Sequence, residues 1–304
     1  MLIDILIGDI SSSSFCLLLI HKRMSTSAIQ DLANFHSFNS AIRFLDALER
    51  SQKVYCLFSH GSYNPIHNDH IRMMQHARDF ILKTEPAAVV IGFFAYTSQS
   101  WMIHGKNMHA SERFSDEDRK NMLLLAIEPF SWLFFAEDGP RFSSTYEVKM
   151  EYLAKFNRET EGIEVIGSDT AGSFGIKKVN QHRIVVMRDE ASGKAGKELQ
   201  NHTQQKIVGS GERNSDKDLE KRVWNESNES MSNQCEFDFE KNLILKGTCG
   251  HSSTKVRRAL VDFCKQSNDG AYKYLQKAIH PKVLEYIILN KDTVMNGALC
   301  CVKD

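Results

Sequence analysis

Gly61-Ser62-Tyr63-Asn64-Pro65-Ile66-His67-Asn68-Asp69-His70 is the stretch that decides the fold of this chain. It follows an apolar run, Val54 to Phe58, and leads into an amphipathic stretch from Ile71 to Leu82. This order predicts a buried strand, a turn that contains glycine, and the start of a helix. In that geometry the free backbone N–H groups of the helix start can bind phosphate.

Two histidines, His67 and His70, stand three residues apart in this stretch. On the first turn of a helix that spacing places both rings on one face, so both can donate to the same anion. The alternatives are a pair of solvated surface histidines and a zinc site, but no third zinc ligand stands at a suitable spacing. Because Gly61, Asn64 and Pro65 surround the pair, the phosphate interpretation is favoured.

A second stretch with related chemistry lies far downstream, Ser252-Ser253-Thr254-Lys255-Val256-Arg257. Hydroxyl side chains favour the start of a helix, where backbone N–H groups are free, and Arg257 adds a fixed positive charge one turn later. Taken alone, the pattern also fits an ordinary capped helix with a surface arginine. Two anion-binding helix starts in one chain predict a polyphosphate ligand.

Segments typical of strands and helices alternate along most of the chain. Strands are expected at residues 54–58, 87–94, 132–135, 163–169, 182–187 and 242–246, with amphipathic helices between several of them. This alternation predicts an α/β fold with a doubly wound parallel sheet, whose ligands bind at the carboxyl ends of the strands. We expect residues 1–50 to form a partly helical N-terminal extension and residues 51–304 to form the main domain.

The bulk composition limits the classes of function. Residues 189–236 are polar with few apolar side chains, so we expect a disordered insertion there. The 38 basic and 38 acidic residues balance, which gives no support for nucleic-acid binding and requires any phosphate site to be local. Seven cysteines without a CxxC pair favour free thiols in a reducing compartment, cytoplasmic or nuclear. The apolar start of the chain contains Asp4 and Asp9, so no membrane span is expected.

The two stretches together resemble the paired signatures of the HxGH-type nucleotidyltransferases, and among these they are most similar to the nicotinamide-mononucleotide adenylyltransferases. The resemblance rests on Gly-Ser-Tyr-Asn-Pro-Ile-His-x-x-His and Ser-Ser-Thr-Lys-x-Arg, and spans residues 54–290 with a gap in the middle. Two positions depart from the family pattern. Asp69 stands where the superfamily usually has glycine, and His251 stands where it usually has an aliphatic residue.

The resemblance implies a Rossmann-like nucleotidyltransferase fold that transfers AMP from ATP to nicotinamide mononucleotide, giving NAD and pyrophosphate. It implies that Arg257 neutralises the leaving pyrophosphate, and that Asp169 contacts the nucleoside. Arg119 and Thr145 also fit the family pattern, although an exposed helical arginine and a plain helix cap are their ordinary interpretations. We expect Mg²⁺ to arrive on the ATP phosphates, without a metal site of protein ligands. The residues expected to contact ligand are His67, His70 and Arg257 for catalysis, and Gly61, Ser62, Tyr63, Asp169, Ser252, Ser253 and Thr254 for nucleotide binding.

Other functions stay open at this point. The family usually stacks a tryptophan on the nicotinamide ring soon after the Gly-x-Asp turn, whereas residues 170–180 contain Phe174 and no tryptophan. One alternative is therefore an adenylyl- or cytidylyltransferase acting on another phosphomonoester. Another is a nucleotide-binding scaffold that has lost its activity. The sequence is compatible with a homo-oligomer but does not predict one.

Overall fold

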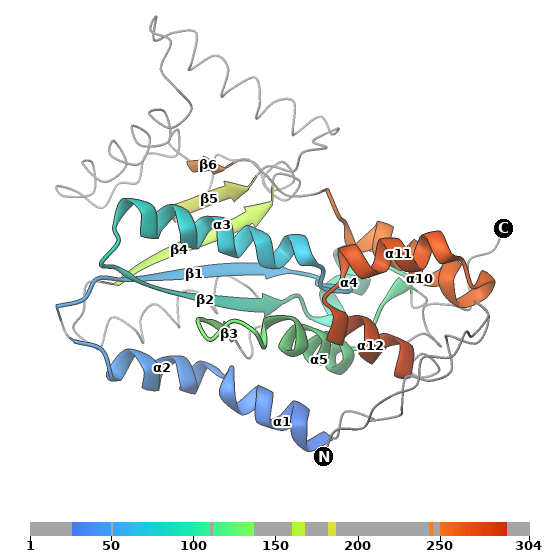
Figure 1. Ribbon diagram of the computed structural model, residues 1–304, viewed down its shortest axis with the longest axis horizontal. Helices are drawn as coiled ribbons and strands as arrows, with labels where there is room; N and C mark the ends of the chain where they lie inside the picture. The colour runs from blue at the N-terminus through green and yellow to red at the C-terminus, as the bar shows by residue number, and fades with distance from the viewer. Residues whose placement is uncertain are drawn as a thin grey trace, which may run out of the picture.

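A computed structural model describes residues 26–49, 51–109, 112–136, 160–167, 182–186, 243–245 and 250–290 (Figure 1). The strands in chain order are β1 (Val54–Gly61), β2 (Val89–Tyr96), β3 (Leu133–Phe135), β4 (Thr160–Gly167), β5 (His182–Val186) and β6 (Leu243–Leu245). The helices are α1 (Thr26–Phe35), α2 (Phe38–Asp46), α3 (Asn68–Thr84), α4 (Gln99–His104), α5 (Asp116–Ile127), α10 (Ser253–Gln266), α11 (Asp269–Ala278) and α12 (Pro281–Leu289).

The six strands form one sheet in the order β3-β2-β1-β4-β5-β6, and every neighbouring pair is parallel. β1 lies inside the sheet, where Val54 pairs with Val89 on one side and with Thr160 on the other. Because a strand in this position is covered on both faces, its sequence is a continuous apolar run. The predicted parallel α/β sheet is thus confirmed.

Helices cover both faces of the sheet. Alternate residues of β1 contribute to different apolar clusters, because side chains of a strand point to opposite faces. Tyr55 and Leu57 belong to the cluster that α3 and α5 complete. Cys56 and Phe58 belong to the cluster that α2 completes. In Figure 1, α3 accordingly lies above the sheet and α2 below it. This arrangement is consistent with a doubly wound sheet.

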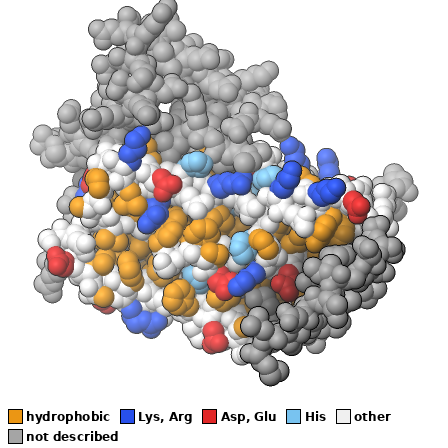
Figure 2. All heavy atoms as spheres, in the orientation of Figure 1, with side chains coloured by type: hydrophobic (Ala, Val, Ile, Leu, Met, Phe, Trp, Pro, Cys, Tyr) orange, Lys and Arg blue, Asp and Glu red, His pale blue; other side chains and the backbone are white. Residues whose placement is uncertain are grey.

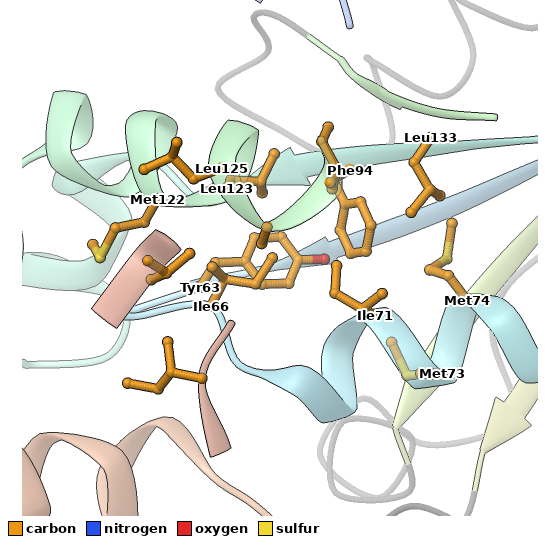
Figure 3. Packing of buried hydrophobic residues seen from close by; sticks show 14 of the residues in the cluster. Tyr63, Ile66, Ile71, Met73, Met74, Phe94, Met122, Leu123, Leu125 and Leu133 are labelled. Carbon is orange, nitrogen blue, oxygen red and sulfur yellow. The ribbon is translucent and has the colours of Figure 1, made fainter. Parts of the chain in front are cut away.

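The turn after β1 is anchored in the larger apolar cluster. Figure 3 shows the ring of Tyr63 lying beside Ile66 and Phe94, with Ile71 of α3 next to it. Tyr63 is 2% exposed, and its hydroxyl donates to Ser59 Oγ at 2.9 Å. Full burial of one aromatic side chain of this kind stabilises a fold by about 1.5–3 kcal/mol, so the packing of Tyr63 fixes the turn on the sheet.

Capping residues mark the starts of several helices. Ser115 caps α5 by accepting from the backbone N–H of Asp118, Ser252 caps α10 in the same way, and Pro281 occupies the first turn of α12. The sequence analysis missed α4 and α11. α4 has only six residues, and α11 has only two buried residues, Leu275 and Ala278. The helix expected near Thr145 and the insertion at 189–236 lie outside the described residues.

The N-terminal region that the structure describes forms two helices, α1 and α2, and the residues between them contact the edge strand β3. Between them, the backbone carbonyl of His36 accepts from Phe135 N–H at 2.7 Å, and its Nδ1–H donates to the carbonyl of Leu133 at 2.8 Å. Ser37 forms a parallel bridge with Phe135. These contacts cover the otherwise open edge of β3.

Candidate active site

A pocket of about 410 Å³ opens at the carboxyl ends of β1, β4 and β5. The neighbours of β1 are β2 on one side and β4 on the other, so the strand order reverses here. Such a reversal point is where open α/β sheets bind ligands. The volume suits a small organic ligand. The pocket is lined by Ser59, His60, Gly61, Ser62, Tyr63, Asn64, His67, Asp69, His70, Met73, Lys106, Met108, Glu112, Val165, Ile166, Gly167, Val186, Ser252, Ser253, Thr254 and Arg257.

The two stretches singled out in the sequence therefore meet at one pocket. All nine of the predicted ligand-binding residues that the structure describes line it, and the tenth, Asp169, lies outside the described residues. Figure 2 shows Lys, Arg and His side chains gathered over the start of α3 and over the neighbouring α10 and α11. The pocket lining itself includes the cationic side chains of Lys106 and Arg257 beside the carboxylates of Asp69 and Glu112.

Gly61 lines the pocket and lies close to the ring of Tyr63. We expected it to let a nucleotide approach the backbone. In the structure a Cβ at Gly61 would lie 3.0 Å from Cε1 of the Tyr63 ring, so the space is used by the protein itself. Tyr63 has a φ of 41°, in the left-handed region that side-chain-bearing residues rarely adopt. The buried ring holds this conformation, and with it the path of the turn.

His67 and His70 lie together at the start of α3. His67 is the N-cap residue, and its backbone N–H donates to His70 Nδ1 at 3.2 Å. The two rings stack with centroids 3.7 Å apart, and Tyr63 meets His70 edge to face. Because Nδ1 of His70 accepts a hydrogen bond, the neutral ring carries its proton on Nε2. His70 therefore has one defined donor for a ligand in the pocket.

The second stretch is tied to the turn between β1 and α3. Ser253 Oγ donates to the carbonyl of Pro65 at 2.9 Å, and Arg257 Nη1 donates to the carbonyl of Asn64 at 2.7 Å. Burial lowers the pKa of Arg257. The charge of Arg258 lowers this pKa further, whereas the charge of Glu112 raises it. The guanidinium has five N–H donors, so the bonds to Asn64 and to Thr254 Oγ1 leave donors for an anion. Arg257 thus both fastens α10 and presents charge to the pocket.

The Asn64-Pro65 turn is shaped mainly by the side chain of Asn64. Its Oδ1 accepts from Phe114 N–H at 2.8 Å, and its Nδ2 donates to the carbonyl of Glu112 at 2.6 Å. The Asn64–Pro65 peptide bond is cis. Asn64 therefore holds the segment before α5 against the turn, as expected for a residue that shapes the loop.

Lys106 and His60 also line the pocket, and the sequence analysis missed both. Lys106 follows α4 and donates to Ser62 Oγ at 2.7 Å. Burial, with a smaller effect of Lys106, lowers the pKa of His60 to about 4, so that His60 is neutral near pH 7. No local pattern marks either residue. Lys106 reaches the pocket because β2 pairs with β1. This pairing cannot be predicted from a local sequence pattern.

Arg119 is a correction to the sequence analysis, which favoured an exposed helical arginine. Its side chain is fully buried, donates to the carbonyls of Ser62 at 2.8 Å and Thr97 at 2.7 Å, and pairs with Asp116. Its guanidinium also lies 4.7 Å from the centre of the Tyr96 ring. Burial lowers the pKa of Arg119, while Asp116 and Tyr96 raise it. Arg119 therefore supports the turn from beneath.

Neither of the two tryptophans that the structure describes, Trp101 and Trp132, lines the pocket. Trp101 on α4 is half exposed and packs over Gly105, where a Cβ would lie 2.6 Å from the indole. Trp132 packs partly buried against the core, with the guanidinium of Arg78 over its ring. Thr145 and Phe174 lie outside the described residues.

No known family model matches this chain, and no curated protein matches it significantly. Among the residues that the structure describes, no helix is long and apolar enough to cross a membrane. The same residues contain no group of three or more His, Cys, Asp or Glu side chains that could hold a metal ion.

Proposed function

We propose that this chain is an HxGH-type nucleotidyltransferase that transfers AMP from ATP to nicotinamide mononucleotide, with NAD and pyrophosphate as products. The observation that carries the proposal is the meeting of the two signature stretches, 182 or more residues apart in sequence, at one pocket, where Asp69 Oδ2 accepts from His251 N–H. A capped surface helix and a chance pair of histidines would have no reason to share a pocket.

The sheet supports the finer fold assignment. The order β3-β2-β1-β4-β5-β6 is the order of Rossmann-type sheets, in which phosphate binds at the turn after the first strand. Here that turn is Gly61 to His67, and α3 begins directly after it. A Rossmann-like nucleotidyltransferase fold accounts for both the order and the place of the pocket.

The reaction would need no covalent intermediate. A phosphate oxygen of the acceptor attacks the α-phosphorus of ATP, a new P–O bond forms, and the bond to the bridging oxygen breaks as pyrophosphate leaves. The protein positions the groups and stabilises charge. His70 Nε2–H donates to a non-bridging phosphate oxygen, and Arg257 with the first N–H groups of α10 binds the departing pyrophosphate.

Mg²⁺ would be held by the ATP phosphates together with water. The described lining fits this arrangement, because both oxygens of Asp69 already accept hydrogen bonds from Arg72 and from His251 N–H. When bound, the ion would neutralise phosphate charge. Its coordination would therefore come mainly from the substrate.

A second cation supports a phosphomonoester acceptor. Lys106 enters the pocket after β2, whereas Arg257 enters it from α10. With Ser62 Oγ beside it, Lys106 offers a second place for a phosphate group. The proposal that the acceptor carries a nicotinamide ring rests on the sequence resemblance alone.

The test is the release of pyrophosphate by purified protein with Mg-ATP, with and without nicotinamide mononucleotide, together with detection of NAD. Release that depends on the mononucleotide, with NAD formed in equal amount, is the expected result. Release only with another phosphomonoester would change the acceptor. Binding of ATP without release for any acceptor would overturn the transferase and favour the scaffold.

A further inference from the structure

A buried carboxylate forms part of the wall of the phosphate pocket. Asp69 is the second residue of α3, and its side chain is 3% exposed. Its Oδ1 accepts from Arg72 Nη1 at 3.2 Å, and its Oδ2 accepts from the backbone N–H of His251 at 2.7 Å. Both carboxylate oxygens are thus held by the protein.

The charge of Asp69 opposes the proposed ligand. It shares the pocket with His67, His70 and Arg257, where a triphosphate would bring several negative charges. Two like charges a few ångströms apart repel even near a protein surface. Electrostatics alone therefore predicts that removal of this carboxylate strengthens ATP binding. If Asp69 nevertheless favours ATP binding, it must do so through the groups that its oxygens bind, Arg72 and His251 N–H.

The bond to His251 fixes the start of α10. His251 immediately precedes the N-cap, Ser252, so holding its N–H fixes the direction in which the helix begins. The His251 ring meets Tyr274 of α11 edge to face, with centroids 5.5 Å apart. The neighbouring residue, Asn68, donates from Nδ2 to the carbonyl of Lys277, also on α11, at 2.8 Å. The first turn of α3 is therefore fastened to the C-terminal helices.

We propose that Asp69 is a positioning residue that holds the start of α10 against the start of α3, so that both helix starts face one triphosphate. The hydrogen bond from His251 N–H to Asp69 Oδ2 is called the strap below. The bonds from Ser253 and Arg257 to the carbonyls of Pro65 and Asn64 act in the same direction. The hydrogen bond from the backbone N–H of His251 to Asp69 Oδ2 joins the two helix starts directly. The inference rests on the proposed function, since it assigns the strap to an ATP site.

Two substitutions of Asp69 distinguish the effect of its hydrogen bond to His251 from the effect of its negative charge. Asp69→Asn removes the charge and keeps an oxygen that can accept from His251 N–H, whereas Asp69→Ala removes both. Repulsion alone predicts tighter ATP binding in both variants. The strap predicts binding equal to wild type or about threefold tighter for Asp69→Asn, and about tenfold weaker for Asp69→Ala, the loss expected for one hydrogen bond to a charged group.

The measurement is calorimetric titration of each folded variant with Mg-ATP, with thermal unfolding recorded alongside. Asp79→Ala is the matched control, because Asp79 is an exposed aspartate on the same helix and its removal changes the net charge equally. We expect ATP affinity of this control to stay within twofold of wild type. Tighter or unchanged binding by Asp69→Ala would overturn the strap, even if its thermal stability fell.

Asp69→Glu keeps the proposal testable if Asp69→Ala does not fold. The glutamate retains the charge but places its oxygens one methylene further out, so the strap predicts weaker ATP binding and repulsion alone predicts no change. Binding by Asp69→Glu as tight as wild type would overturn the strap.

ATP affinity also separates this proposal from the transferase proposal. If wild-type protein binds ATP but forms no NAD, the affinity pattern still decides the strap while the acceptor proposal fails. If wild-type protein does not bind ATP, both proposals fail. In an active enzyme, the KM for ATP should rise in Asp69→Ala while the KM for the acceptor changes less than threefold, a split that general destabilisation would not produce.

Discussion

Arg119 on α5 donates to the carbonyl oxygen of Ser62, 2.8 Å away, from a position 57 residues further along the chain. The same nitrogen donates to the carbonyl of Thr97. One guanidinium therefore joins the ends of β1 and β2, and does so beneath the turn that faces the pocket. A buried charge in this position links the stability of the fold to the shape of the site.

Arg119→Met should lower the free energy of unfolding by about 2–4 kcal/mol, because two buried carbonyls lose their donor. Urea unfolding followed by circular dichroism checks this. Arg43→Met, an exposed arginine on α2, is the control and should change stability by less than about 0.5 kcal/mol. Equal effects of the two substitutions would contradict the role assigned to Arg119.

His70→Ala should reduce turnover by roughly 10²–10³-fold while leaving the thermal midpoint nearly unchanged, because its Nε2–H would act on charge that develops in the transition state. His76→Ala removes an exposed histidine from the same helix and should keep wild-type turnover. Steady-state pyrophosphate release at saturating ATP makes the comparison. A folded His70→Ala protein with near-normal turnover would remove His70 from the mechanism.

Lys106→Met should raise the KM for the phosphomonoester acceptor by about tenfold or more and raise the KM for ATP less, because a charge-assisted hydrogen bond to the acceptor phosphate is lost. Lys83→Met, on the exposed face of α3, is the matched control. Initial rates over both substrates separate the two KM values. A rise confined to ATP would place Lys106 at the triphosphate instead.

His36 should make stability depend on pH. It is fully buried, its Nε2 has no hydrogen-bond partner, and burial lowers its pKa from 6.5, although the Leu133 carbonyl and Glu128 raise it. Below pH 6.5 the unfolded chain therefore binds more protons than the folded chain, so stability is fully present above that pH and falls as the pH decreases toward the folded pKa. His36→Gln should be less stable than wild type at pH 7.5, and the difference should narrow by pH 5.5. The urea unfolding midpoints of both proteins at pH 7.5 and pH 5.5 measure this difference in stability. The same difference at both pH values would contradict a lowered pKa of His36 in the folded chain.

The sequence predicts those parts of the fold and the site that depend on local pattern. The buried run of β1, the capped starts of α5 and α10 and the histidine pair are all readable within ten or so residues, because caps and apolar periods are local properties. The strap at Asp69, the position of Lys106 and the burial of Arg119 are not readable in this way. Each depends on which strands are neighbours and which helix packs where, and these are contacts between distant residues.

Gly61 shows a subtler limit. The sequence predicts that a nucleotide approaches the backbone there, and the structure shows the ring of Tyr63 close to the same position. A glycine pattern reports that something approaches the backbone and does not say whether it is a ligand or the protein. Asp169 and Thr145, which lie outside the described residues, remain predictions.

The pocket can be completed only late in synthesis, because β1 pairs with β4 and the β1–α3 turn is bonded to α10. During synthesis the ribosome releases the histidine pair long before it releases Arg257, 187 residues after His70. Until α10 emerges, the pocket lacks the wall that α10 provides, and the contacts between α10 and the β1–α3 turn can form only when these two distant parts of the chain come together. A nascent chain therefore cannot hold a nucleotide between both helix starts, and a premature stop before residue 250 would leave the histidines on a surface without the α10 wall of their pocket.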